Sequence, residues 1–418
     1  MSDRLENARR TLAAHNQSHL LTFFDDLNDE QQDGLLTQIE SVDFASIDRL
    51  IESHVRVKPA HDSLEDLKPA PYFPQSPTDA YDVDHYRAAG EALIREGRVA
   101  AFTVAGGQGT RLGWKGPKGT FPASVVTGKP LFRLFAEQIL AVNAKYDTRV
   151  PWYIMTSPMN DAETRAFFRD NRFFGLDRGD IVMFPQGTMP SIDATTEKIL
   201  LADKGEIALN PDGHGGAIRA MRASGAVEHM RKRGIEQISY FQVDNPNVIV
   251  VDPLFLGLHA AAPESSGQMS SKMVAKTYPE EKVGVFCESA GKTTVVEYSD
   301  LPEELAAERD DAGDLRFIAG NIAIHALSVA FVEHLTDDAS AFGLPYHRAD
   351  KKVPFINTDN GSKVEPGEPN AVKLETFVFD AIPLADASIV VETDRTREFA
   401  PIKNADGVDS VQTSHQLQ

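Results

Sequence analysis

A glycine-rich loop in the first third of the chain is followed closely by cationic side chains. The loop spans residues 106–111 with the sequence GGQGTR, and Arg111, Lys115 and Lys118 lie within eight residues of one another. Glycine permits positive φ and a close approach of the backbone to a ligand, and successive amide N–H groups can form a concave nest for an anion. These residue types at this spacing predict binding of a polyphosphate.

Neither of the two common phosphate-binding loops matches this stretch. The Walker pattern requires Lys followed by Ser or Thr, but Lys118 is followed by Gly119. The dinucleotide fingerprint requires glycine at its first, third and sixth positions, and starting from Gly107 the sixth residue is Leu112. A tight turn between a strand and a helix, with surface lysines, is the alternative that the loop alone leaves open.

Further polar and glycine-rich motifs follow along the chain. In order they are FPQG at 184–187, PDGHGG at 211–216, VDN at 243–245, VVEYS at 295–299, GNIAIH at 320–325, LETFVFD at 374–380 and FAPIKNAD at 399–406. Together with the loop and the Pro-Lys pair at 117–118, they resemble the UDP-N-acetylhexosamine pyrophosphorylase family, the eukaryotic-type enzymes that make UDP-N-acetylglucosamine. The resemblance runs from about residue 20 to about residue 406.

This resemblance implies a uridylyltransferase that converts UTP and N-acetylglucosamine 1-phosphate into UDP-N-acetylglucosamine and pyrophosphate. The difficulty of the reaction is to bring a sugar-phosphate oxygen into line with the α-phosphorus of UTP, since both partners are anions. Catalysis then consists mainly of positioning and of charge neutralisation by cations, Mg²⁺ among them. No protein nucleophile is required.

The resemblance assigns the glycine loop and a second loop to the nucleotide. Arg111 would fork onto oxygens of the triphosphate and Lys118 would act as a point charge near the α-phosphate, whereas Lys115 has no firm counterpart. Gln186 would read the uracil edge with its amide; a loop glutamine considered alone is more often solvent-facing. The further nucleotide-binding residues expected are Gly106, Gly107, Gly109, Thr110, Gly213 and His214.

His214 leaves the identity of the sugar open. The N-acetylhexosamine enzymes carry Asn where this chain has His214, while UDP-glucose and broad UDP-sugar pyrophosphorylases carry His. The glycine turn that contains it precedes a predicted helix, so the turn's amides would face the nucleotide or the sugar phosphate. A hydrogen bond of the imidazole within the turn is the alternative role.

Asp244 and Lys403 are the expected metal and phosphate contacts. By the resemblance, Asp244 holds the Mg²⁺ that bridges the nucleotide phosphates, and one carboxylate suffices because Mg²⁺ keeps several waters. Capping of the following helix is the other role open to an aspartate at a strand end. Lys403 would reach back to the substrate phosphates, with a surface lysine as the alternative. The expected catalytic set is Arg111, Lys118 and Lys403.

The sugar-binding residues implied by the resemblance are Glu297, Asn321, Glu375, Phe377 and Phe379. Glu297 would accept hydrogen bonds from sugar hydroxyls. Alternation would put Glu375, Phe377 and Phe379 on one face of a strand, where an aromatic ring could pack against the sugar or its acetyl methyl group. Packing in the core is the competing explanation for both phenylalanines.

Strand-like and helix-like stretches alternate around these motifs. Strands are predicted at 99–104, 152–155, 181–184 and 238–243, and helices at 86–95, 130–143, 161–171 and 217–233. This order predicts an α/β fold with a doubly wound mixed sheet, which the resemblance makes a Rossmann-like, GT-A-like nucleotidyltransferase. Ligands bind such sheets at the carboxyl ends of strands, where the glycine loop and Asp244 fall. Residues 272–298 predict a β-rich antiparallel insertion beside the main sheet.

Three segments are expected along the chain. Residues 1–80 form an N-terminal helical module, with Asn28 and Gln31 capping one helix, and a proline-rich connector. Residues 81–406 form the uridylyltransferase catalytic domain, and residues 407–418 begin a C-terminal segment that is short or truncated relative to the family. The prolines of the connector are Pro59, Pro69, Pro71, Pro74 and Pro77.

The composition argues against several other classes of protein. The net charge of −20 disfavours a surface for nucleic acid or for anionic membranes. The single cysteine, Cys287, excludes an intrachain disulfide, and the lack of a signal-like or membrane-spanning stretch predicts a cytoplasmic location. Two other functions stay open: a UDP-glucose, UDP-galactose or broad UDP-sugar pyrophosphorylase, and a non-catalytic UDP-sugar-binding protein.

Overall fold

The computed structural model describes residues 2–57, 66–76, 80–337 and 343–418, and these residues form two compact units. The N-terminal unit consists of Met1–Asp62, Gly187–His214 and Pro345–Phe377, and the sheet unit consists of Ser63–Gln186, Gly215–Leu344 and Val378–Gln418. The N-terminal helices therefore share a unit with two segments from the region expected to be catalytic.

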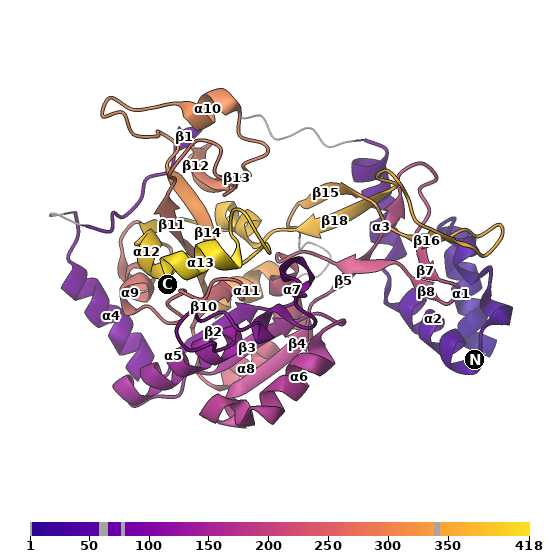
Figure 1. Ribbon diagram of the computed structural model, residues 1–418, viewed down its shortest axis with the longest axis horizontal. Helices are drawn as coiled ribbons and strands as arrows, with labels where there is room; N and C mark the ends of the chain where they lie inside the picture. Colours follow the sequence, from indigo (N-terminus) through magenta and orange to yellow (C-terminus); the bar gives the residue numbers. More distant parts are fainter. Residues whose placement is uncertain (1, 58–65, 77–79, 338–342) are drawn as a thin grey trace. The chain divides into compact units, whose positions relative to one another are not determined.

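The sheet unit is built on one mixed β-sheet (Figure 1). Within the described residues this sheet has ten strands, with a central order of β1-β12-β14-β10-β2-β3-β4. Strands β10, β2, β3 and β4 are parallel neighbours, and β14 runs antiparallel to β10. The predicted mixed α/β sheet is thereby confirmed. The strands are β1 (Lys68–Pro69), β2 (Val99–Val104), β3 (Trp152–Thr156), β4 (Ile181–Pro185), β10 (Gln237–Gln242), β11 (Met269–Ala275), β12 (Val285–Ser289), β13 (Lys292–Val296), β14 (Ala319–Ser328) and β19 (Val390–Glu392).

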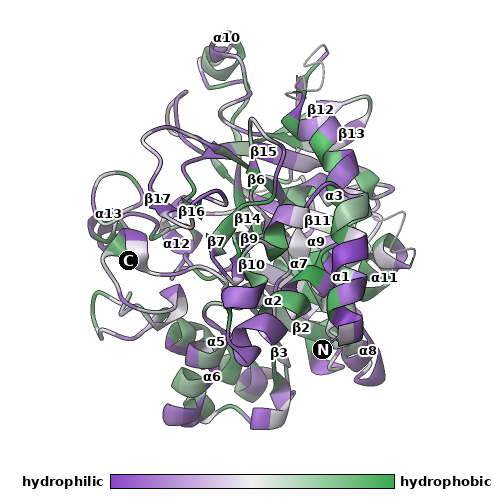
Figure 2. Ribbon diagram, turned by 90° about the vertical axis from the view of Figure 1, so that its right-hand side faces the viewer, coloured by the Kyte–Doolittle hydropathy of each residue, from purple (hydrophilic) through white to green (hydrophobic). Residues whose placement is uncertain are grey.

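Strands β2, β3 and β10 are buried along nearly their whole length, whereas β4 is mostly half-buried. Ala100 and Phe102 in β2 and Tyr153 and Ile154 in β3 are fully buried, which is typical of a sheet covered on both faces. Figure 2 shows both hydrophilic and hydrophobic residues on α5 and α6, as expected for helices that have one side on a core and the other in water. The helices here are α4 (Val83–Arg95), α5 (Leu131–Tyr146), α6 (Asp161–Asp170), α7 (Gly216–Ala223), α8 (Ala226–Lys232), α9 (Pro253–Ala261), α10 (Glu303–Ala307), α11 (Val329–Thr336), α12 (Arg395–Glu398) and α13 (Val411–Leu417).

Two predicted elements of the sheet unit differ in the structure. The single helix expected at 217–233 is two helices, α7 and α8, because Gly225 between them has a left-handed φ of 76°. The insertion expected beside the sheet at 272–298 belongs to the sheet itself, since β12 pairs with both β13 and β14. An antiparallel hairpin has an unpaired edge, and joining the main sheet satisfies it.

The N-terminal unit packs three helices against short β-structures. Leu12, Leu35 and Leu36 from the helices share one core with Ile192 and Leu374 from the strands. The capping box predicted between Asn28 and Gln31 is confirmed. The elements are α1 (Ser2–Ala14), α2 (Asp29–Ser41), α3 (Phe44–Leu50), β5 (Thr188–Pro190), β6 (Ile192–Asp193), β7 (Leu201–Asp203), β8 (Glu206–Ile207), β9 (Leu209–Pro211), β15 (Tyr346–Lys351), β16 (Phe355–Ile356), β17 (Lys363–Val364) and β18 (Ala371–Thr376).

Part of the expected connector is extended. Lys68–Pro69 pairs with β12 as strand β1, and Phe73 forms a bridge to Val391. Pro59 and Pro77 lie outside the described residues. Across the part of the chain that the structure describes, no helix is long and apolar enough to cross a bilayer.

Candidate active site

The glycine loop begins directly after β2, and its carbonyl groups and its amide groups differ in their hydrogen bonding. The amide of Lys118 donates to the Gly107 carbonyl over 3.0 Å, and Asn160 Nδ2 donates to the carbonyls of Ala105 (3.0 Å) and Gly107 (3.3 Å). The amide groups of Gly106 and Gly107 have no hydrogen-bond acceptor among the described residues. This arrangement leaves N–H donors available to an anion.

Asn160 supports the loop by hydrogen bonds to its carbonyl groups, and its role was not predicted from the sequence. Its side chain is fully buried, and its Oδ1 accepts a hydrogen bond from the amide of Ser157 at 2.8 Å. It follows β3, the strand next to β2, so the signal that could have revealed it is a polar residue after the neighbouring buried strand.

Gln186 lies directly against the loop backbone. Its side chain is 8% exposed, and its own amide donates to the Thr156 carbonyl over 2.9 Å. A Cβ on Gly106 would lie 2.7 Å from Gln186 Oε1, so a side chain there would require Gln186 to shift. Gly106 and Gln186, both assigned to the nucleotide by the family resemblance, are therefore neighbours in the structure.

Gly109 supports the loop rather than presenting its amide to a ligand. Its N–H donates to the Gly116 carbonyl at 2.9 Å, and the ring of Trp114 takes the place that a Cβ would occupy, at 2.8 Å. Trp114 Nε1 in turn donates to Thr120 Oγ1 over 2.9 Å. Trp114 is a second loop-supporting residue that the sequence analysis missed.

Two loop cations have no acidic partner among the described residues. Arg111 is exposed within the turn Thr110–Leu112, and Lys118 is half-buried where the turn Lys118–Thr120 begins. Within the described ranges, neither side chain makes a hydrogen bond or an ion pair. Both are therefore available to neutralise a bound phosphate chain.

Asp244 lies at the same sheet edge as the glycine loop. Gln242 at the end of β10 pairs with Val104 at the end of β2, and the amide of Val243 donates to the Val104 carbonyl at 3.0 Å. The half-buried Asp244 carboxylate makes no hydrogen bond or ion pair with another described side chain. Groups of three or more potential metal ligands are absent from the described residues, but one free carboxylate beside a phosphate site suits Mg²⁺, which takes few protein ligands.

Lys403 lies beside Asp244 although the two are distant in the chain. The amide of Ile402 donates to the Asp244 carbonyl over 2.8 Å, and Lys403 Nζ forms an ion pair with Asp409 Oδ2 at 3.2 Å. Burial alone would lower the pKa of the Lys403 ammonium, but the carboxylates of Asp244, Asp409 and Glu297 raise that pKa above its ordinary value. The lysine is thus held as a cation close to the candidate metal ligand.

Glu297 and Asn321, both predicted to contact the sugar, are both neighbours of Gly284. A Cβ on Gly284 would lie 3.1 Å from Glu297 Oε1, and the amide of Asn321 donates to the Gly284 carbonyl at 2.7 Å. Asn321 Oδ1 accepts from the amide of Ala323, whose φ of 55° marks a break in the β11–β14 register. Such irregularities in a strand can re-aim a side chain.

Four of the predicted residues, Gly213, His214, Glu375 and Phe377, belong to the N-terminal unit, whereas the exposed Thr110 lies in the sheet unit. Gly213 has a φ of 86°, and a Cβ there would overlap the Thr376 carbonyl. The ring of His214 stacks on Phe377 with centroids 5.1 Å apart, and His347 stacks on Phe377 at 4.3 Å. Neither the stacking of His214 nor the role of His347 was predicted from the sequence.

The expected common face of Glu375, Phe377 and Phe379 is wrong. Strand β18 ends at Thr376, whose amide donates to the Asp212 carbonyl over 2.8 Å, and this bond turns the chain. Phe379 lies in the 3₁₀ segment Val378–Leu384 of the sheet unit and is 5% exposed. Core packing therefore describes Phe379, while Phe377 is half-exposed between two histidine rings.

Comparison with known proteins finds relatives over nearly the whole chain. The family model described as UTP–glucose-1-phosphate uridylyltransferase matches residues 49–415. A UDP-N-acetylhexosamine pyrophosphorylase-like protein 1 from Xenopus tropicalis is 37% identical and covers 97% of this chain and 81% of its own length. A UDP-N-acetylglucosamine diphosphorylase 2 from Arabidopsis thaliana is 34% identical, with 95% and 79% covered. The solved structure of the uridine diphosphate N-acetylglucosamine pyrophosphorylase from Trypanosoma brucei, in complex with an inhibitor, matches with a TM-score of 0.83 and 32% identity over 100% of this chain and 84% of that one.

Proposed function

Because the chain belongs to the UTP–glucose-1-phosphate uridylyltransferase family, we propose that it makes UDP-N-acetylglucosamine and pyrophosphate from UTP and N-acetylglucosamine 1-phosphate. The observation that carries this proposal is that one sheet edge bears the open amides of the glycine loop, the Asp244 carboxylate and the Lys403 ammonium. Relatives named for N-acetylated sugars support the choice of sugar.

The chemical step is an in-line displacement at phosphorus. An oxygen of the sugar phosphate forms a bond to the α-phosphorus of UTP, and the bond from that phosphorus to the α–β bridging oxygen breaks. The electron pair of the broken bond leaves with pyrophosphate. Because no protein group bonds to the substrate, the protein contributes positioning and charge stabilisation.

The loop residues bind and orient the nucleotide in this mechanism. The amides of Gly106 and Gly107 donate to phosphate oxygens, Thr110 adds a hydroxyl, and Gln186 reads the uracil edge. Arg111 and Lys118, which pair with no acidic side chain in the part of the chain that the structure describes, offset the negative charge of the triphosphate. A Cβ on Gly107 would lie 3.9 Å from Lys118 Cε, and Arg111 lies in the turn that follows the loop, which supports these roles.

Lys403 and Asp244 act at the reacting phosphates. The raised pKa of the Lys403 ammonium keeps it charged at neutral pH, so it attracts the sugar phosphate toward the nucleotide. Asp244 would hold Mg²⁺, which when bound neutralises charge on the nucleotide phosphates.

Glu297 and Asn321 are the proposed contacts to the sugar hydroxyls. Their meeting at Gly284 supports a shared role. Glu375, Gly213, His214 and Phe377 stay predictions of the family resemblance; they lie in the N-terminal unit, where His214 and Phe377 stack. His214 also favours a second candidate, a UDP-glucose or broad UDP-sugar pyrophosphorylase, because those enzymes carry a histidine at the corresponding position.

The proposed partners are UTP and a sugar 1-phosphate. Nucleic acid and membrane surfaces are not proposed as partners. The net charge of −20 supports this exclusion, because both of those partners are polyanions. We place the protein in the cytoplasm, a compartment that suits its single cysteine, Cys287, which is buried and unpaired.

The test measures pyrophosphate release with UTP and Mg²⁺, comparing the 1-phosphates of N-acetylglucosamine, N-acetylgalactosamine, glucose and galactose. We expect the fastest release with N-acetylglucosamine 1-phosphate. Preference for glucose or galactose 1-phosphate would instead establish the second candidate. Release with none of the four, from a protein that binds UTP, would contradict both and identify a binding protein.

A further inference from the structure

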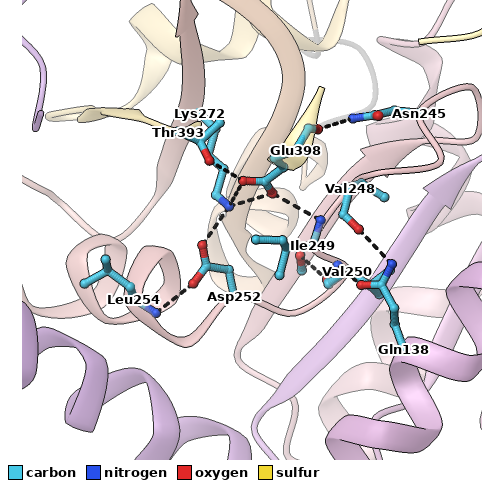
Figure 3. Close-up of polar contacts among 11 residues, drawn as sticks. Gln138, Asn245, Val248, Ile249, Val250, Asp252, Leu254, Lys272, Thr393 and Glu398 are labelled. Carbon is cyan, nitrogen blue, oxygen red and sulfur yellow. Dashed lines mark hydrogen bonds and ion pairs between the residues drawn. The ribbon is translucent and has the colours of Figure 1, made fainter. Parts of the chain in front are cut away.

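A lysine, Lys272, is buried between two carboxylates, one of which, Glu398, lies five residues before Lys403 in the chain (Figure 3). Lys272, in β11, is 2% exposed, and its Nζ lies 2.7 Å from Asp252 Oδ2 and 2.6 Å from Glu398 Oε2. Glu398 is fully buried. Charges in such a place require nearly complete hydrogen bonding to be tolerated.

Each carboxylate of this group is bound by further donors. Glu398 accepts from Thr393 Oγ1 at 2.5 Å and from the amide of Ile249 at 3.2 Å. Asp252 accepts from the amide of Leu254 at 2.9 Å, where it caps α9. Glu398 is therefore tied to β11, to the chain before α9 and to the residues after β10.

Asn245 continues this connection from Glu398 to the active site. Its Nδ2 donates to the Glu398 carbonyl over 2.7 Å, and its Oδ1 accepts from the Ala400 amide at 3.1 Å. One residue earlier, Asp244 accepts from the Ile402 amide at 2.8 Å. These three hydrogen bonds set the register of 398–402 along 244–245.

Lys403 comes directly after residues 398–402, whose register these hydrogen bonds fix. Beyond it, residues 404–408 are exposed, and the Lys403 amide is bound only by the Asp409 carbonyl at 2.7 Å. The anchor at Glu398 thus sets where the backbone of Lys403 begins relative to Asp244, while Asp409 holds the ammonium through the ion pair. A displacement of about 1 Å in such a group can lower turnover roughly a hundredfold.

We propose that Glu398, held by the buried Lys272, is a positioning residue that sets Lys403 opposite Asp244 through Asn245. The inference rests on the proposed function. Glu398 contacts no substrate in this account; it acts only through the placement of the lysine. Its effect on turnover should therefore depend on the presence of the Lys403 side chain, whereas its effect on stability should not.

The test is a double-mutant cycle of Glu398→Gln and Lys403→Ala, measured as kcat, KM and thermal midpoint. Glutamine keeps the volume of Glu398 but removes one charge from the group. We expect Glu398→Gln to lower kcat roughly tenfold to a hundredfold with little change in the KM for UTP. In the Lys403→Ala background the same substitution should lower kcat by less than about threefold, because the residue it positions is gone.

Asp180→Asn is the matched control. Asp180 is also a nearly buried carboxylate bound by two cations, Arg149 and Arg233, but it precedes β4 and so lies at the opposite end of the parallel strands. This variant should lower the thermal midpoint and leave kcat unchanged. If Glu398→Gln does not fold, Thr393→Val, which removes one hydrogen bond to Glu398, replaces it in the cycle.

The outcomes separate this inference from the proposed function. An inactive wild-type protein overturns the proposed function and the inference with it. An active wild-type protein whose Glu398→Gln variant has normal kcat overturns the inference alone. Equal losses in the presence and absence of Lys403 also overturn it, since they would show a general effect of the buried group.

Discussion

The side-chain amide of Gln186 packs directly against the backbone of Gly106. A Cβ on Gly106 would lie 2.7 Å from Gln186 Oε1, and Gln186 is held in place by its own amide, which donates to Thr156. The two loops that the proposed mechanism assigns to the nucleotide therefore form one surface. A side chain at residue 106 would require Gln186 to move away from this position.

Replacement of Gly106 by alanine should impair UTP binding in a protein that still folds but is less stable. The added methyl group would push Gln186 or the loop away from its position, and such overpacking typically costs about 1–3 kcal/mol. We expect the KM for UTP to rise roughly tenfold, while the KM for the sugar 1-phosphate changes little. Steady-state kinetics with either substrate varied measures both values.

Gly34→Ala is the control for a glycine substitution. Gly34 lies within α2, and nothing is within 4 Å of the place where its Cβ would be. This variant should keep the wild-type KM values and gain up to about 1 kcal/mol of stability, because alanine favours helix over glycine. A Gly106→Ala variant with an unchanged KM for UTP would argue against a nucleotide site at this surface.

Lys403→Ala should lower kcat by roughly 10²–10³, the loss typical of removing one electrostatic stabiliser. Folding should be preserved, because the side chain is 39% exposed and its ion pair with Asp409 is of a kind that adds little stability. Lys115→Ala is the comparison: this exposed loop lysine should be replaceable with normal kcat. Turnover close to wild type in Lys403→Ala would remove Lys403 from the mechanism.

Motifs located the strand ends that form the site because parallel strands deliver their carboxyl ends to one edge. That rule placed Asp244 beside the glycine loop. The same rule could have indicated Asn160, which follows β3, but it does not apply to Glu398, whose partners Lys272 and Asn245 are distant in sequence. The error at Phe379 has a similar origin, since the Thr376–Asp212 hydrogen bond that ends β18 joins residues far apart in the chain.

Asp244→Asn should weaken the binding of Mg²⁺, so that turnover requires more of it. An amide oxygen carries no charge, so the Mg²⁺ concentration for half-maximal turnover should rise about tenfold or more. Titration of the rate with Mg²⁺ after chelation measures this, with Asp406→Asn as the exposed control in the Lys403 segment. Identical Mg²⁺ curves for wild type and Asp244→Asn would exclude Asp244 as the ligand.

His259 should make the stability of the protein sensitive to acid. The imidazole is fully buried between Ser270 Oγ (2.8 Å) and Gln237 Oε1 (3.0 Å). Burial lowers the pKa of His259 from 6.5 to about 4. Between these two values the unfolded chain binds a proton that the folded protein refuses, so the free energy of unfolding falls as the pH falls. Above pH 6.5 both states are neutral at this residue and the contribution is constant.

Thermal or urea unfolding at a series of pH values from 7 to 4 tests this expectation. Linkage gives a loss of about 3 kcal/mol from this one residue over the window. His259→Gln should be less stable at neutral pH but should show a flatter decline on acidification, whereas His334→Gln, at an exposed position, should decline as the wild type does. Carboxylates also titrate in this range, so the difference between variant and wild type is the quantity to compare. Parallel declines for wild type and His259→Gln would show that His259 accepts its proton in the folded state.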